Sequence, residues 1–277
     1  MALRIATNVP SITAQRAMNS SQRSADKAMA QLSTGTRITK AADDAAGLSI
    51  SENLKSNIRS YKQAGRNTQD GISLVQVAEG ALGEVSNIIT RFRELSIQAS
   101  SDTIGDQERS FIQAEVDQMK NEVERIAQAT QFGDKKLLNG EGDTFDFQVG
   151  IHADPELNSI SFDAAQTDAT LGTLGLGGLD ISSKEGAQSA LEMIDEAQTM
   201  VNGYRANLGA LQNRLTTTTE NVDSAIENLS SANSRIRDAD IAQSSAELTK
   251  NNILLNATTS VLTQANQSPQ MALRLVG

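Results

Sequence analysis

The sequence predicts a mainly α-helical protein with a long coiled-coil helical hairpin body, a small β-hairpin region and two terminal helical arms. Three observations support this prediction. Through most of the interior, apolar residues recur at alternating spacings of three and four, the heptad pattern of packed helices. Near residues 144–151 the pattern changes to strict alternation, which is typical of a strand. Trp is absent and aromatic residues are 3% of the 277 residues, so the core must be mostly aliphatic.

The first predicted element is the N-terminal arm, residues 1–42. Gln15, Asn19 and Gln22 interrupt its narrow apolar stripe. Pro10 would disturb an interior helical turn, so we expect the helix to begin near it. The stripe consists of Ile5, Val9, Ile12, Met18, Ala25 and Leu32.

The stretch KAADDAAGLSI, residues 40–50, sets Asp43 and Asp44 between alanine pairs. Adjacent residues on a helix point about 100° apart, so they cannot act as a catalytic carboxylate pair. They suit a helix start, where one carboxylate caps free N–H groups and the other favours the positive end of the helix dipole. Asp43 and Asp44 are therefore predicted to form a helix cap at the joint between arm and body.

The body is predicted from three heptad segments. Residues 43–139 hold two of them, and the long helix of residues 183–236 holds the third, whose five heptads span about 50 Å. The stripes are Val75, Ala78, Leu82, Val85, Ile89 and Phe92; Ile112, Val116, Met119, Val123 and Ile126; and Val201, Tyr204, Leu208, Leu211, Leu215, Thr218, Val222, Ala225, Leu229, Ala232 and Ile236.

Residues 140–182 are predicted to form a β-hairpin and a glycine-rich linker. The stretch TFDFQVGI alternates apolar and polar residues, a turn is expected around Asp154-Pro155, and ISF follows. Three of the six phenylalanines lie here, so we expect a small separate apolar core. The stretch LGTLGLGGLD is read as a flexible return linker, because Asp180 stands where the last glycine of a GxGxxG phosphate loop would fall.

The C-terminal arm, residues 237–277, repeats an apolar residue every seventh position among Ser, Asn and Thr. These positions are Ile241, Leu248, Leu255 and Leu262. Such narrow stripes bury too little to offset the entropy of ordering a solitary helix, so we expect both arms to be disordered in the isolated chain and to fold against partners. The alternative is that the arms pair with each other in one chain.

Several classes of function are poorly supported. The net charge is −10, and the basic first 40 residues contain no aromatic side chain to stack on bases, which argues against nucleic acid. There is no cysteine and one histidine, His152, so thiolate, HExxH and multi-histidine metal sites are excluded, and no GxSxG elbow is present. No catalytic, cofactor-binding or metal-binding residue is predicted. Exposed threonines within the run at 216–219 could carry sugar.

No stretch approaches 18 apolar residues, and the N-terminus lacks an apolar segment of signal-peptide length. We therefore expect no membrane insertion. The chain is expected to be either cytosolic or exported by a route that reads no cleaved signal.

Five stretches together resemble one family, the bacterial flagellins. They are QLSTGTRITKAADDAAGLSIS, NTQDGISLVQVAEGAL, LGALQNRL, SRIRDADIA and QANQSPQMALRLVG. The resemblance implies a structural, non-enzymatic subunit that self-polymerises into the flagellar filament, with the arms forming its inner tube. Because only residues 140–182 separate the two conserved halves, the chain resembles a minimal form without large outer domains.

The resemblance also implies partners and a location. It implies secretion through the flagellar type III pathway into an extracellular filament, an export chaperone on the C-terminal arm, and filament cap and junction proteins. RFRELSIQ and FIQAEVDQ resemble the segments that a host Toll-like receptor recognises, which implies Arg91, Leu95 and Glu115 as its contacts. The alternatives are a hook–filament junction protein, similar at its ends but present in few copies, and another secreted coiled-coil protein.

Overall fold

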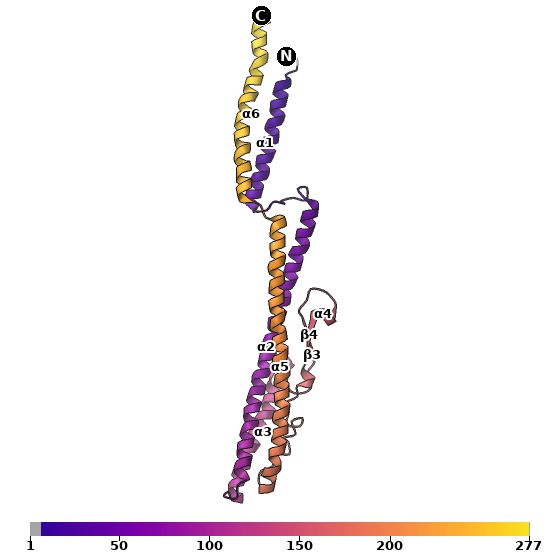
Figure 1. Cartoon of the computed structure of the whole chain (residues 1–277), viewed down its shortest axis with the longest axis vertical. Helices are drawn as coiled ribbons and strands as arrows, with labels where there is room; N and C mark the ends of the chain where they lie inside the picture. Colours follow the sequence, from indigo (N-terminus) through magenta and orange to yellow (C-terminus); the bar gives the residue numbers. More distant parts are fainter. Residues whose placement is uncertain (1–6, 277) are drawn as a thin grey trace. The chain divides into compact units, whose positions relative to one another are not determined.

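The computed structural model describes residues 7–276, with side chains described up to residue 267. Its main elements are long helices (Figure 1). They are α1 (Val9–Thr34), α2 (Ala45–Ala99), α3 (Asp106–Ala129), α5 (Lys184–Arg237) and α6 (Ile241–Val276). Between α3 and α5 lie strands β1 (Gln131–Phe132), β2 (Lys135–Lys136), β3 (Thr144–Gln148) and β4 (Ser159–Asp163), helix α4 (Pro155–Asn158) and the 3₁₀ turn η1 (Ala164–Gln166). The mainly helical prediction is confirmed.

The chain divides into two compact units. One contains residues up to Ile58 together with those from Asn228 onward, and the other contains Arg59–Glu227. Both divisions fall inside long helices, α2 and α5. We call the first the arm unit and the second the body unit. The predicted boundaries at 42/43 and 236/237 lie instead near the breaks between helices, in the linker before α2 and at the end of α5.

The body unit packs α2, α3 and α5 around an aliphatic core, as the heptads predict. Leucine, isoleucine and valine side chains of these helices are fully buried, and Phe92 of α2 is the largest fully buried side chain among the described residues. The residues at 0% exposure include Val75, Ala78, Leu82, Val85, Ile89, Val116, Val123, Val201 and Leu215. Because these positions repeat every three or four residues, each helix presents one continuous stripe to its neighbours.

The predicted β-hairpin is present. Strands β3 and β4 pair antiparallel, with Phe145 opposite Phe162, and their connection contains the one-turn helix α4 at the expected Pro155 turn. A second, shorter ribbon was not predicted: β1 pairs with β2 across a two-residue turn whose Gly133 has a φ of 61°. The hairpin does not have a separate core, because Ile160 and Phe162 join the same buried cluster as the helices.

The prediction of a flexible glycine linker is wrong. Leucines and an isoleucine alternate with the glycines of this segment, and their side chains enter the core at 0–1% exposure: Leu174, Leu176, Leu179 and Ile181. Side chains of α3 satisfy its backbone. Lys120 Nζ donates to the carbonyls of Gly177 and Leu179, and Gln113 Oε1 accepts from the Ile181 N–H at 2.8 Å. The segment is therefore a packed layer over α3.

The arm unit pairs α1 with α6 (Figure 1). Helix α1 begins beside Pro10, as predicted, because the Asn8 side chain accepts from the Ser11 N–H and the proline lacks a donor to leave unpaired. It ends at Gly35, whose φ of 68° forms a left-handed cap. The structure thus follows the alternative of arms paired within one chain, and the expected disorder of the arms is not what it shows.

Candidate assembly surfaces

The paired helices α1 and α6 bury small apolar side chains. Among the described side chains of these two helices, the buried apolar ones are Ala14, Ala25, Ala28 and Ala265. Polar bonds join the two helices near the chain ends, where Asn8 Nδ2 donates to the Ala265 carbonyl at 2.8 Å and Ser11 Oγ donates to Asn266 Oδ1 at 2.9 Å. Alanine permits close backbone approach, but each one removes little apolar surface from water.

The larger apolar side chains that the structure describes in these two helices are half-buried or exposed. Of the predicted interface residues, Met18, Leu32, Leu248, Leu255 and Leu262 are half-buried. Val9, Ile12 and Ile241 are 55%, 45% and 53% exposed, and Ile5 lies outside the described residues. Sequence reasoning did not single out four other exposed residues of these helices, Met29, Ile253, Leu254 and Val261. The last three lie between the seventh-residue positions of α6, so a wider stripe would have included them.

At the joint, the linker between α1 and α2 lies against the linker between α5 and α6. Thr36 and Asp238 form an isolated antiparallel bridge, the Arg37 N–H donates to the Arg237 carbonyl at 2.6 Å, and the Ala239 N–H donates to the Gly35 carbonyl at 3.0 Å. Each linker therefore supplies backbone partners to the other. Nearby, Ser51 Oγ of α2 lies 2.7 Å from Asn233 Oδ1 of α5, and Arg237 forms an ion pair with Glu52.

The two aspartates of the joint have different partners. Asp44 is the helix cap that the sequence predicts, because its Oδ1 accepts from the Gly47 N–H at 2.8 Å in the first turn of α2. Asp43 faces the other way. Its Oδ2 accepts from the Thr39 and Lys40 N–H groups and from the Thr39 hydroxyl, and its Oδ1 lies 3.0 Å from Lys27 Nζ of α1.

These partners all favour the charged form of Asp43. Lys27 is the main cause, and the Thr39 hydroxyl and the two backbone donors add to it, so the pKa of Asp43 is held well below its usual range. The sequence indicates a joint at this position but gives no sign that Lys27, sixteen residues earlier, is the partner. Only the chain reversal after Gly35 brings the two together.

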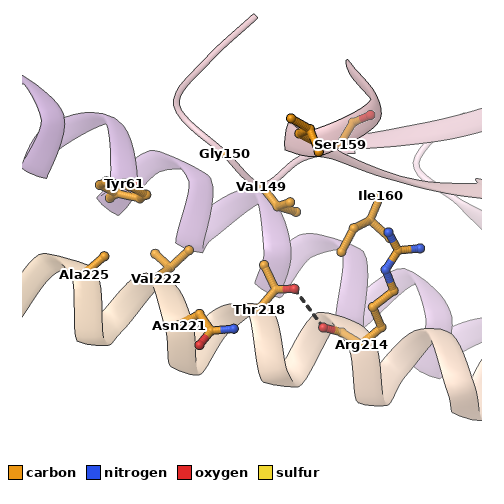
Figure 2. Close-up of a pocket in the computed structure, with 11 residues that line it drawn as sticks. Tyr61, Val149, Gly150, Ser159, Ile160, Arg214, Thr218, Asn221, Val222 and Ala225 are labelled. Carbon is orange, nitrogen blue, oxygen red and sulfur yellow. Dashed lines mark hydrogen bonds between the residues drawn. The ribbon is translucent and has the colours of Figure 1, made fainter. Parts of the chain in front are cut away.

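The β-hairpin is seated on α2 at a glycine. A Cβ on Gly71 would lie 3.1 Å from the Phe147 ring, and Asn67 Nδ2 donates to the Gln148 carbonyl at 3.0 Å. Beside this contact lies a groove between the hairpin and helices α2 and α5 (Figure 2). Tyr61 of α2 and Val222 of α5 line it opposite Ile160, and Arg214 is the charged residue in its lining.

The residues implied as receptor contacts are not all on the surface. Arg91 of α2 and Glu115 of α3 are exposed and paired, with Arg91 Nη2 at 3.0 Å from Glu115 Oε1. Glu94 and Glu115 raise the pKa of Arg91. Leu95, in contrast, is 1% exposed and belongs to the core, so the structure brings two of the three residues into one exposed cluster.

The remaining sequence features form no reactive site. His152 is exposed in the hairpin connection. Within the threonine run, three hydroxyls donate to backbone carbonyls four residues earlier, from Thr216, Thr218 and Thr219. Among the described residues there is no group of three or more His, Cys, Asp or Glu able to hold a metal ion. Within that part of the chain no helix has the length and hydropathy of a membrane span.

Two family models match the chain, one in its N-terminal half and one in its C-terminal part. Residues 5–143 match the bacterial flagellin N-terminal helical region, and residues 191–276 match the bacterial flagellin C-terminal helical region. The chain belongs to the bacterial flagellin family. The interval between the two matches is short, which confirms the prediction of a flagellin without large outer domains.

Individual flagellins match over nearly their whole length. The chain is 46% identical to a flagellin of Halalkalibacterium halodurans over 97% of this chain and 98% of the relative. It is 38% identical to a flagellin of Bacillus subtilis over 99% and 100%. It is 40% identical to the flagellar filament 33 kDa core protein of Treponema phagedenis over 97% and 98%.

Two solved structures resemble the fold. A Bacillus cereus flagellin matches with a TM-score of 0.51 and 29% identity, over 61% of this chain and 94% of that one. A putative flagellar hook-associated protein of Vibrio parahaemolyticus matches with a TM-score of 0.59 over 71% of this chain and all of that one. At 14% identity the second match shows the fold alone.

Proposed function

We propose that this flagellin is the structural subunit that polymerises into the bacterial flagellar filament, the helical propeller of swimming cells, and that it has no catalytic role. The observation that carries the proposal is the apolar surface that the paired arms leave exposed. Side chains such as Ile12, Ile241 and Ile253 are about half exposed or more, so the pairing of α1 with α6 does not cover them. Neighbouring subunits offer matching stripes, because every copy carries the same two arms.

The geometry of such contacts sets the form of the assembly. A contact between unlike faces of identical subunits repeats indefinitely if it does not close into a ring, and the product is an open helical filament. The predicted arm residues Ile5, Val9, Ile12, Met18, Leu32, Ile241, Leu248, Leu255 and Leu262 are proposed to form the innermost subunit contacts. Burial of each large side chain there contributes about 1.5–3 kcal/mol.

Several partners follow from membership of the family. The subunit is proposed to leave the cell through the flagellar export pathway, to bind an export chaperone through its C-terminal arm, and to meet cap and junction proteins at the filament ends. Arg91 and Glu115 are proposed to form the exposed part of a host Toll-like receptor epitope, and Leu95 would contribute by supporting that surface from the core.

Deletion of residues 241–277 tests the proposal. The truncated chain should stay helical, because the core of the body unit lies between Leu74 and Leu215. It should fail to polymerise, since it lacks α6. Circular dichroism measures the first property and electron microscopy the second, after the same salt-induced polymerisation of the full chain. Filaments formed by the truncated chain would contradict the proposal.

The alternative function is that of a junction protein present in few copies, and a hook-associated protein shares the fold. The two functions differ in the number of copies that the filament contains. A filament subunit should be the main protein sheared from the cell surface, whereas a junction protein should be a minor one. Quantitative mass spectrometry of sheared filaments distinguishes them.

A further inference from the structure

Asp43 connects two parts of the arm unit, helix α1 and the linker that leads to α2. From the linker it accepts the Thr39 N–H at 3.2 Å, the Thr39 hydroxyl at 2.9 Å and the Lys40 N–H at 3.1 Å. From α1 it receives Lys27 Nζ at 3.0 Å. Its side chain is 19% exposed, although the aspartate stands in a surface linker. One carboxylate thus satisfies donors on both sides of the chain reversal at Gly35.

We propose that Asp43 is an acid-sensitive latch: as a carboxylate it holds α1 against the linker that leads to α2, and its protonation loosens α1 from that linker. The inference concerns the single chain and does not depend on filament formation. The latch consists of Asp43, Lys27 and Thr39 with the Lys40 N–H.

The donors explain why the charge matters. A carboxylate accepts at both oxygens, whereas a protonated acid or an amide presents a donor group on one side. That donor would face the N–H groups of Thr39 and Lys40 or the Lys27 ammonium. Charge-assisted hydrogen bonds are about twice as strong as neutral ones, so neutralisation of the side chain removes about half of the strength of each bond that remains.

Few other charged groups face this carboxylate. The charged group that α1 presents to Asp43 is the Lys27 ammonium. The linker presents the Lys40 backbone N–H, while the Lys40 side chain is exposed. From the start of α2, Asp44 turns its carboxylate to the Gly47 N–H. Further side-chain hydrogen bonds between α1 and the linker are uncharged: Gln31 Nε2 donates to the Arg37 carbonyl at 2.9 Å, and the hydroxyls of Thr34 and Thr36 lie 3.0 Å apart. Titration of Asp43 therefore changes the latch without a second acid in direct contact.

The direction of the pH effect follows from the lowered pKa of Asp43 in the closed latch. An open latch returns Asp43 to the ordinary aspartate pKa of about 3.9. Above that pH both states are ionised and the latch is fully stabilising. Below it the open state binds a proton that the closed state does not, so each further pH unit favours opening by about tenfold until the closed state also titrates.

A spin-label distance across the joint tests the latch. The chain has no cysteine, so cysteines introduced at the exposed Ser20 of α1 and Ser49 of α2 carry the labels alone. Pulsed electron–electron double resonance on single chains should give one narrow distance distribution at pH 7. Between pH 4 and pH 2 the distribution should broaden.

Variants assign the change to Asp43. Asp43→Asn should broaden the distribution at pH 7 to the width that the parent chain reaches in acid, and should show little further pH response. Asp44→Asn is the matched control, because it removes the neighbouring charge while asparagine still caps α2. It should behave like the parent chain. Lys27→Met, which leaves the linker donors in place, should broaden the distribution less than Asp43→Asn.

Three results would overturn the latch. They are a broad distribution in the parent chain at pH 7, a narrow one in Asp43→Asn at pH 7, and a narrow one in the parent chain at pH 2. Circular dichroism on each variant verifies that the body remains helical, so a folding failure is not mistaken for an opened latch.

Discussion

The body and the arms are both built of long helices, yet they bury different side chains. In the body, Phe92, Leu82 and Ile89 are completely buried, and three helices share one core. In the arms the buried apolar side chains that the structure describes in α1 and α6 are alanines, while Ile12, Ile253 and Val261 remain about half exposed or more. Since stability scales with the apolar area removed from water, we expect the body to be stable in one chain and the arms to depend on further contacts.

The largest expected effect lies in the body core. Phe92→Ala removes a fully buried ring and should lower the free energy of unfolding by about 3–5 kcal/mol, through lost burial and the cavity left behind. Phe111→Ala is the matched control, because its ring is 67% exposed. Its effect should stay within about 0.5 kcal/mol. Chemical denaturation followed by circular dichroism measures both, and equal effects would break the comparison between core and surface.

The second effect separates stability from assembly in the arms. Ile253→Ser alters a side chain that is 63% exposed, so the free energy of unfolding of the single chain should change by about 0.5 kcal/mol or less. If neighbours bury Ile253, the loss of about 2 kcal/mol raises the critical concentration for polymerisation about thirtyfold.

The control for this prediction is Asn256→Ser on the same helix, an exposed polar residue whose substitution should leave the critical concentration nearly unchanged. Light scattering at a series of protein concentrations measures it. An unchanged critical concentration for Ile253→Ser would remove Ile253 from the proposed subunit contact.

A smaller effect on thermal stability tests how tightly the β-hairpin packs on α2 at Gly71. Gly80→Ala places a Cβ in open space within α2 and should stabilise the body by about 0.5–1 kcal/mol, since alanine favours helix more than glycine does. Gly71→Ala places its Cβ against the Phe147 ring, so the hairpin must shift and the propensity gain is offset by about 1 kcal/mol or more. Thermal unfolding should therefore order the chains as Gly80→Ala, parent, Gly71→Ala. Equal shifts would show that the hairpin seat is loose.

The sequence predicted the heptad helices because their signal is local and repeated. The stripe from Val75 to Phe92 needs no knowledge of its partner, and the alternation around Phe145 and Phe147 similarly marks a strand. The capping role of Asp44 was predictable for the same reason, because the residues it caps follow it directly.

The failures concern partners that are distant along the chain. The segment with Leu174, Leu176 and Leu179 was read as flexible because of its glycines, but Lys120 and other side chains of α3 hold its backbone. The glycine content of a segment indicates how freely its backbone can move, but it does not indicate which side chains pack against that segment. The contact of Asp43 with Lys27 was missed because it depends on where the chain reverses.

Pairing of the arms was only an alternative, because their stripes are too narrow to predict a stable helix pair. In the structure the paired arm helices bury alanines, leave the larger apolar side chains that are described half-buried or exposed, and form a few polar bonds. The stability of the paired arms in a single chain depends on how much of their apolar surface stays exposed. Sequence periodicity does not measure that exposure.

Hydrogen exchange tests most directly whether the arms acquire their full stability from neighbouring subunits. Mass spectrometry should compare backbone amides of α1 and α6 with those of α2 between Leu74 and Leu95, first in dilute single chains and then in filaments. We expect arm amides to exchange at least about a hundredfold faster than body amides in single chains, and to become protected in filaments. Arms as strongly protected as the body in single chains would contradict the account.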